Sequence, residues 1–161
     1  MDAERDRLLM LPDAELSKLC DLDFFKATGP GGQKRNKSSS AVRLTLRGSD
    51  LSVTDCTERS QHQNRARALR KLRMLLALRF RREFAGLIRV NCAAAHMDYP
   101  LYVAQMLDAL AECDWEIAPA AVKLGMSTTM LWKKLSRDRE LWQFFAAARR
   151  EIGAPPLKPA E

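Results

Sequence analysis

The stretch from Ser60 to Phe84 restricts the fold more than any other part of the sequence, because it contains no glycine or proline and is rich in helix-forming residues. Apolar residues recur along it in steps of three and four, at Leu69, Leu72, Leu76 and Phe80. This spacing predicts one amphipathic helix with a single apolar stripe. At 1.5 Å per residue the helix would be roughly 37 Å long, and its stripe would need an apolar surface to cover.

Short segments with the pattern of strands precede this helix and predict that surface. Ala41–Leu46 (AVRLTL) alternates apolar and polar residues, and LSVTDC from Leu51 does the same after the turn RGSD, so the two segments form a hairpin. Leu22–Ala27 is expected to be a further strand and Pro12–Leu19 a short helix. The N-terminal half is thus predicted to be a small β-sheet with a hairpin, packed on the long helix.

The residues after Gly86 predict a second part made of helices. Gly86–Pro100 has the composition of a connection, and the helices expected beyond it are Leu101–Glu112, Ile117–Leu124, Thr128–Leu135 and Arg139–Ile152. The fold class is therefore α+β, followed by an all-α C-terminal domain. We expect the first domain at residues 1–86, a linker at 87–100, the helical domain at 101–153 and a tail at 154–161.

The positive charge of the chain is concentrated in one segment. The 161 residues carry a formal net charge of +7. Counted along the sequence, Lys26–Arg89 holds 16 Lys and Arg against 4 Asp and Glu, whereas residues 91–161 hold 8 against 9. A localised cationic excess is typical of a nucleic-acid-binding surface. The alternative is a solvated basic surface that only aids solubility.

Several absences in the sequence narrow the class of protein further. No apolar run approaches the roughly 20 residues of a membrane-spanning helix, and the N-terminus lacks an apolar stretch with a cleavage site, so we expect a cytoplasmic protein with no membrane partner. No CxxC pair occurs, and the two histidines do not complete a recognisable metal-ligand motif with the cysteines. Reduced thiols, no metal and no cofactor are therefore expected; the residues concerned are Cys20, Cys56, Cys92, Cys113, His62 and His96.

A glycine-rich, cationic segment, KATGPGGQKRNKSS from Lys26 to Ser39, separates the first two predicted strands. Glycine-rich turns often bind phosphates, but this one lacks the GxxxxGK[ST] spacing of a P-loop. It also leads into a strand, whereas the GxGxxG dinucleotide motif opens a helix. Neither phosphate motif fits, so the segment needs another interpretation.

Two ordered motifs of this chain resemble the catalytic domain of class I peptide chain release factors and of the short ribosome-rescue hydrolases. The first, GPGGQKRNKSSSAVRLT, contains the family's signature at Gly31, Gly32 and Gln33. The predicted hairpin follows it, as in the family, and the resemblance covers about residues 20 to 84. The second motif, CTERSQHQNRARAL, matches another family signature through Arg59, Ser60, Gln61, Asn64 and Ala68-Leu69.

The resemblance implies hydrolysis of the ester that joins a nascent peptide to transfer RNA in the ribosome. In the family the main-chain amide of Gln33 stabilises the negative charge that develops on the attacked carbonyl, and one such donor is worth on the order of 3 kcal/mol. The Gln33 side chain shapes the pocket for water, while Gly31 and Gly32 let the main chain approach the terminal adenosine. The implied partners are peptidyl-tRNA and the 23S-type ribosomal RNA of the peptidyl transferase centre, and the chain is expected to be a monomer off the ribosome.

Basic and polar side chains near this loop are expected to contact RNA phosphates, through salt-sensitive contacts without sequence preference. Arg59 and Gln61 have a second interpretation, in which they tie the hairpin to the start of the long helix. Ser60 is expected to cap that helix, and His62 to be exposed on it. The candidate RNA-binding residues are Lys34, Arg35, Asn36, Lys37, Arg43, Arg59, Gln61, Arg67 and Lys71.

The chain departs from codon-reading release factors in its N-terminal part. Those factors carry additional domains that recognise stop codons, whereas only about 20 residues precede the first predicted strand here. The short rescue hydrolases lack such domains, but many have a long basic tail, which the near-neutral C-terminal segment does not resemble. The favoured hypothesis is a codon-independent peptidyl-tRNA hydrolase that frees stalled ribosomes.

The segment Ala120–Leu135, AAVKLGMSTTMLWKKL, resembles the helix-turn-helix of Fis-like DNA-binding proteins, with a turn at Leu124-Gly125-Met126 and a cap at Ser127. The alternative is a plain helical hairpin whose Leu131, Trp132 and Leu135 are core. A second functional hypothesis follows, a nucleic-acid-binding regulatory protein with an inactive Gly-Gly-Gln domain. The candidates for nucleic-acid contact in this segment are Thr128, Thr129, Lys133 and Lys134.

Overall fold

The computed structural model describes residues 4–26, 40–89 and 91–159. The chain divides into two compact units, each of which is described by itself. The first, here called the sheet unit, is Asp6–Leu76. The second, the helical unit, begins at Ala77 and also includes Arg5. Within the described ranges, no helix is long and apolar enough to cross a membrane.

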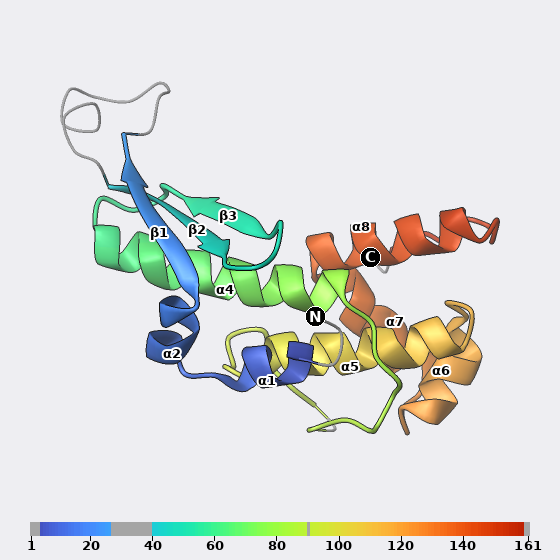
Figure 1. Ribbon diagram of the computed structural model, residues 1–161. Coiled ribbons are helices and arrows are strands. Elements are labelled where there is room, and N and C mark those ends of the chain that lie inside the picture. Colours follow the sequence, from blue (N-terminus) through green and yellow to red (C-terminus); the bar gives the residue numbers. More distant parts are fainter. Residues whose placement is uncertain (1–3, 27–39, 90, 160–161) are drawn as a thin grey trace. The chain divides into compact units, whose positions relative to one another are not determined.

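The sheet unit contains an antiparallel sheet of three strands in the order β1-β2-β3 (Figure 1). The hairpin predicted from the sequence is the β2–β3 pair, and its turn passes through Gly48 at a φ of 73°, a left-handed conformation that favours glycine. The α+β class is confirmed. The strands are β1 (Cys20–Phe25), β2 (Ala41–Leu46) and β3 (Ser52–Asp55).

The central strand β2 has the alternation that its sequence predicts. Val42, Leu44 and Leu46 are buried, while Arg43 between them is exposed. Successive side chains of a strand point to opposite faces, so the three apolar residues lie on one face of the sheet. This face forms part of the core of the sheet unit.

The long helix α4 (Gln61–Arg79) runs along one face of the sheet (Figure 1). Leu69, Leu72 and Leu76 are buried, which confirms the predicted apolar stripe at these three positions. Complete burial of one such side chain stabilises the fold by about 1.5–3 kcal/mol. Two short helices precede the sheet: α1 (Arg5–Met10), which the sequence did not predict, and α2 (Asp13–Lys18), which it did.

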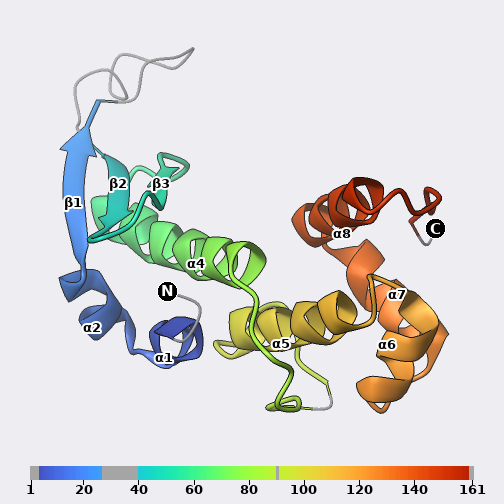
Figure 2. The same ribbon diagram turned by 45° about the vertical axis from the view of Figure 1, so that its right-hand side comes forward.

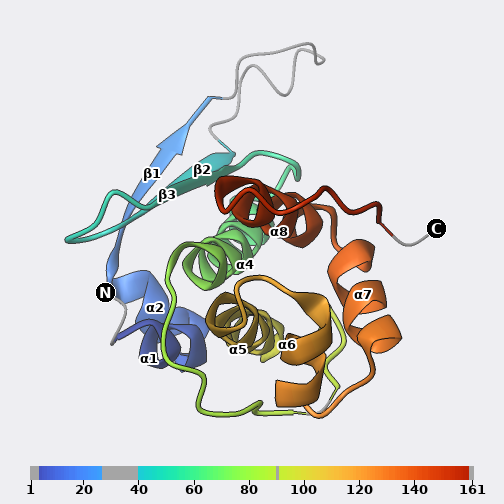
Figure 3. The same cartoon turned by 90° about the vertical axis from the view of Figure 1, so that its right-hand side faces the viewer.

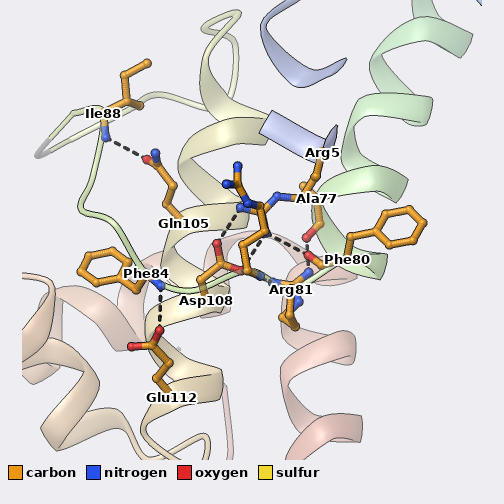
Figure 4. Close-up of polar contacts among 10 residues, drawn as sticks. Arg5, Ala77, Phe80, Arg81, Phe84, Ile88, Gln105, Asp108 and Glu112 are labelled. Atoms are coloured by element: carbon orange, nitrogen blue, oxygen red, sulfur yellow. Dashed lines mark hydrogen bonds and ion pairs between the residues drawn. The ribbon is translucent and has the colours of Figure 1, made fainter. Parts of the chain in front are cut away.

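Helix α4 ends at Arg79, earlier than the sequence predicted, although no glycine or proline intervenes. Hydrogen bonds to other segments replace helical ones beyond that point (Figure 4). The carbonyl of Phe80 accepts a bond from Arg5 at 2.9 Å, and the N–H of Arg82 donates to Asp108 Oδ1 at 3.0 Å. Because these backbone groups find partners outside the helix, local helix propensity does not decide where the helix ends.

The segment that follows α4 is held by one side of α5 (Tyr99–Glu112). Three α5 side chains, spaced by three and four residues and so on one side of that helix, accept hydrogen bonds from backbone N–H groups of this segment (Figure 4). Asp108 is buried and also binds the Arg5 guanidinium through both carboxylate oxygens, at 2.7 and 2.6 Å. The three backbone contacts are Ile88 to Gln105 at 2.8 Å, Arg82 to Asp108 at 3.0 Å and Phe84 to Glu112 at 2.7 Å.

The helical unit is built from α5 and three further helices, with α7 between α6 and α8 (Figure 2, Figure 3). Helix α5 is the central element, because most of its side chains are buried. All four helices begin and end within a few residues of the positions that the sequence predicted. The other three are α6 (Ile117–Lys123), α7 (Thr128–Arg137) and α8 (Arg139–Glu151).

Helices α6 and α7 form a helix-turn-helix. The turn passes through Gly125 at a φ of 66°, a left-handed conformation that other residues rarely adopt. The Ser127 hydroxyl accepts a hydrogen bond from the Met130 N–H at 3.2 Å, and this is the helix cap that the sequence predicted. Leu131 and Leu135 are completely buried, so α7 combines a core-facing side with an outward side.

Candidate functional site

The first two strands border the glycine-rich segment in the sequence. The β1–β2 ladder closes with Phe25 opposite Ala41, so residues 27–39 connect the end of β1 to the start of β2. Those residues lie outside the described part of the chain. This applies to the predicted catalytic and RNA-binding positions Gly31, Gly32, Gln33, Lys34, Arg35, Asn36 and Lys37.

Asn64 anchors the backbone next to this segment. Its side chain donates to the carbonyls of Ser40 and Glu58 at 2.7 and 2.9 Å, and accepts from the Glu58 N–H at 2.8 Å. Asn64 is completely buried in the first turn of α4. One amide side chain therefore joins the residue after the glycine-rich segment to the loop that precedes the helix.

The positioning role of Asn64 was not predicted, although the sequence carries a signal for it. Asn64, Ala68 and Leu72 follow each other in steps of four, and all three are buried. A neutral polar residue in the apolar register of a helix must find hydrogen-bond partners when it is buried. A polar residue in an apolar stripe therefore indicates a side chain that hydrogen-bonds to, and so holds, nearby backbone.

Asp55, at the end of β3, forms ion pairs with two of the predicted RNA-binding cations. Lys71 Nζ lies 2.8 Å and Arg67 Nε 3.4 Å from Asp55 Oδ2, and the Thr57 N–H donates to Asp55 Oδ1 at 3.0 Å. Burial raises the pKa of this carboxyl, but the hydrogen bonds from Lys71 and Thr57 and the Lys71 charge outweigh it, so the pKa is lowered overall. Lys71 and Arg67 thus hold the strand to α4 while their half-exposed side chains remain open to solvent.

The remaining described RNA-binding candidates lie on the surface of the sheet unit. Arg43 is exposed on β2, and its guanidinium carbon lies 5.3 Å from the centre of the Phe25 ring. Arg59 is exposed in the bend before α4, and Gln61 is exposed at the first residue of that helix. Arg43 therefore lies beside the end of the β1–β2 ladder, where the glycine-rich segment begins.

The nucleic-acid candidates of the helical unit lie along α7. Thr128, Thr129 and Lys133 are exposed. Lys134 is partly buried, donates a hydrogen bond to Asn91 Oδ1 at 2.5 Å and lies 5.2 Å from the centre of the Tyr102 ring. The outward side of α7 is therefore polar and cationic. Within residues 4–26, 40–89 and 91–159, no group of three His, Cys, Asp or Glu side chains lies close enough to hold a metal ion.

Two family models match separate parts of this chain. Residues 14–86 match the RF-1 domain, and residues 104–137 match the model described as bacterial regulatory protein, Fis family. The first match includes the sheet and α4, and the second includes α6 and α7. Both resemblances that the sequence motifs indicated are confirmed: residues 14–86 are similar to the RF-1 domain, and residues 104–137 are similar to the Fis-family helix-turn-helix.

Individual relatives match over the RF-1 part. Peptide chain release factor 2 of Paramagnetospirillum magneticum is 51% identical over 57 residues, which cover 35% of this chain and 15% of that protein. Peptide chain release factor 1 of Salinibacter ruber is 50% identical over 52 residues, covering 32% and 15%. Peptide chain release factor 2 of Beutenbergia cavernae is 38% identical over 93 residues, covering 53% and 25%. The chain thus spans a quarter or less of the length of these relatives.

Proposed function

We propose that this chain hydrolyses the ester bond of peptidyl-tRNA on the ribosome, with the segment around Gly31, Gly32 and Gln33 placed in the peptidyl transferase centre. The observation that carries the proposal is the RF-1 match over residues 14–86, which includes the signature and the strands on either side of it. Named release factors share this part of the chain.

The chemistry follows from the peptide backbone of the signature. Water attacks the ester carbonyl, and the main-chain N–H of Gln33 donates to the oxygen on which negative charge develops. Glycine at positions 31 and 32 allows backbone angles that other residues cannot adopt and removes the Cβ atoms that would meet the adenosine. The β1–β2 ladder and the Asn64 contact to Ser40 support the proposal, because a donor acts on a transition state only when its position is fixed.

The basic residues of the sheet unit contact RNA phosphates when the chain binds the ribosome. Lys34, Arg35 and Lys37 flank the signature, and Arg43 lies near the base of the same segment. Contacts of these cations with phosphates are independent of sequence and weaken as salt increases. Asn36, Arg59, Gln61, Arg67 and Lys71 complete the proposed RNA-binding set.

We further propose that the reaction is independent of a codon and frees stalled ribosomes. What supports this is the Fis-family match that follows the RF-1 match, because a helix-turn-helix can contact nucleic acid without reading a codon. The chain acts as a monomer off the ribosome, in the cytoplasm, and uses no cofactor.

Peptide release from ribosomes stalled on a message without a stop codon tests the proposal. The native chain releases the peptide, whereas Gly32→Ala lowers the release rate by about 100-fold or more, because a misplaced backbone donor loses most of its effect. Ser38→Ala is the matched control in the same segment and retains the native rate. Release that is equally fast in Gly32→Ala excludes the proposed chemistry.

A second candidate function rests on the Fis-family match alone. In it the chain is a nucleic-acid-binding regulator that contacts its target through Thr128, Thr129, Lys133 and Lys134, and the Gly-Gly-Gln segment is inactive. The same experiment separates the two candidates when duplex DNA binding is measured beside it. Tight binding to a defined DNA sequence without any peptide release favours the regulator.

A further inference from the structure

A concave, cationic surface lies on one flank of α7. It has a volume of about 360 Å³. The side chains that give it its chemistry are three cations, two hydroxyls and one amide: Lys133, Lys134, Arg137, Ser127, Thr129 and Asn91. We call this surface the cationic basin. All six residues belong to the helical unit.

Among the described residues, the cations of the basin have no carboxylate partner in an ion pair. In the described part of the chain, no carboxylate forms an ion pair with Lys133 or Arg137. Lys134 binds the neutral oxygen of Asn91 at 2.5 Å and the face of Tyr102. The contrast with α4 is direct, because Arg67 and Lys71 of that helix pair with Asp55.

Lys134 carries its charge in surroundings that disfavour it. Burial lowers the pKa of its ammonium group, and the positive charge of Arg137 lowers it further, with a small opposing effect from Cys92. Cations that lie close together without a counter-charge repel each other, and an anion between them stabilises the charged form. Hydroxyl and amide groups beside the cations add neutral hydrogen-bond partners of the kind that phosphate oxygens use.

A second hollow, of about 700 Å³, adjoins the basin, and Thr129 and Lys133 line both. Its lining also includes the apolar side chains of Ile117, Trp132 and Leu157. The cations of the basin lie in the middle and last turn of α7, whereas a helix-turn-helix reads base edges mainly with the first residues of its second helix. The basin is therefore suited to phosphate contacts that carry no sequence information.

We propose that the cationic basin binds the phosphate backbone of ribosomal RNA and anchors the helical unit to the ribosome. The proposal rests on the proposed function, since the RF-1 domain is what brings the chain to a particle made largely of RNA. Its occupant is an RNA strand or helix recognised through phosphates, and its contacts weaken with increasing salt.

Binding of the full chain to purified ribosomes at several salt concentrations tests this proposal. The test variant combines Lys133→Gln, Lys134→Gln and Arg137→Gln. The matched control removes the same charge from exposed positions of the same unit, through Arg139→Gln, Arg150→Gln and Lys158→Gln. Circular dichroism checks that both variants fold, and duplex DNA of random sequence serves as a competing ligand.

We expect the test variant to bind ribosomes at least about tenfold more weakly than the control. The slope of log affinity against log salt concentration should decrease by roughly 0.7–0.9 for each lost phosphate contact. An unchanged affinity and slope, or an equal loss in the control, overturns the proposal. Basin-dependent binding to DNA without binding to ribosomes overturns it as well. Basin-dependent ribosome binding without peptide release supports the anchor and rejects the proposed hydrolysis, so the two failures are distinguishable.

Discussion

The two ends of α4 are held by different chemistry. In the sheet unit, the neutral amide of Asn64 makes three hydrogen bonds to the backbone of Ser40 and Glu58. In the helical unit, the ion pair of Arg5 and Asp108 binds the backbone that leaves the helix, and both of its side chains are buried. The same task, holding irregular backbone beside a helix end, is thus performed once by a neutral group and once by a charged pair.

The comparison shows why the two anchors should respond differently to mutation. A buried neutral amide with all its bonds made carries a small desolvation penalty, and its removal leaves only neutral backbone groups unpaired. A buried ion pair contributes little net stability, but removal of one partner leaves an uncompensated charge in the interior. The charged anchor should therefore be the more sensitive of the two to a single substitution.

Removal of the Asp108 carboxylate should have the largest effect on stability. Asp108→Ala should lower the free energy of unfolding by about 3–5 kcal/mol, because the buried Arg5 guanidinium loses its ion pair with Asp108. Urea denaturation followed by circular dichroism measures the change. The double variant Arg5→Met with Asp108→Asn removes both charges of this pair and keeps an acceptor for the Arg82 N–H. It should recover part of the loss, because Arg81, which lies 3.7 Å from Asp108 Oδ1, still loses its ion pair. A double variant as unstable as the single one contradicts the assignment of the effect to the unpaired charge.

Truncation of the neutral anchor should have a smaller effect on stability and a separate effect on activity. Asn64→Ala should lower the free energy of unfolding by about 1–3 kcal/mol, because it leaves the carbonyls of Ser40 and Glu58 without a donor. Under conditions in which the variant is folded, peptide release should also slow, since Ser40 directly follows the segment with the Gly-Gly-Gln signature. Asn64→Asp keeps the acceptor for the Glu58 N–H and loses both donors, so it should be no better than alanine. Native release by a folded Asn64→Ala variant would show that the anchor does not position the segment.

Substitution of Asp55 should have the smallest effect on stability, because the cations that pair with this carboxylate are half exposed. It is also the most selective test of a charged anchor. Its pKa is lowered in the folded protein, so its stabilising effect is complete above the ordinary carboxyl range, about pH 4, and is lost as the pH falls through the lowered folded value. Asp55→Asn should lower the free energy of unfolding by about 1 kcal/mol at pH 7, since Lys71 and Arg67 are screened by solvent. The difference between native and variant should shrink toward pH 3 in urea titrations. A difference that stays constant across this range argues against a role for the Asp55 charge.

Much of the fold could be predicted because local pattern and tertiary structure agree. The alternation in β2 and the three- and four-residue steps at Leu69, Leu72 and Leu76 place the same side chains in the core that the structure buries. The cap at Ser127 and the glycine in the turn before it mark the start of α7 correctly. In each of these cases the decisive contacts lie within a few residues of one another.

The failures arise where distant residues decide the local structure. The end of α4 depends on Arg5 and Asp108, which lie far from it in the sequence, so helix propensity alone extends the helix too far. The role of Asn64 likewise depends on the carbonyl of Ser40. The candidate catalytic residues were found through the Gly31, Gly32 and Gln33 signature, and the backbone around them lies outside the described residues.

The placement of Arg5 has a consequence for dividing the protein into fragments. The sheet unit begins only at Asp6, so the chain crosses between the units twice, just after Arg5 and just after Leu76. A fragment that begins at Ala77 would keep the interior carboxylate of Asp108 and Arg81 beside it, but would lose the bidentate contact with Arg5. Separate production of the C-terminal part therefore calls for a short N-terminal peptide that supplies Arg5, added back in solution.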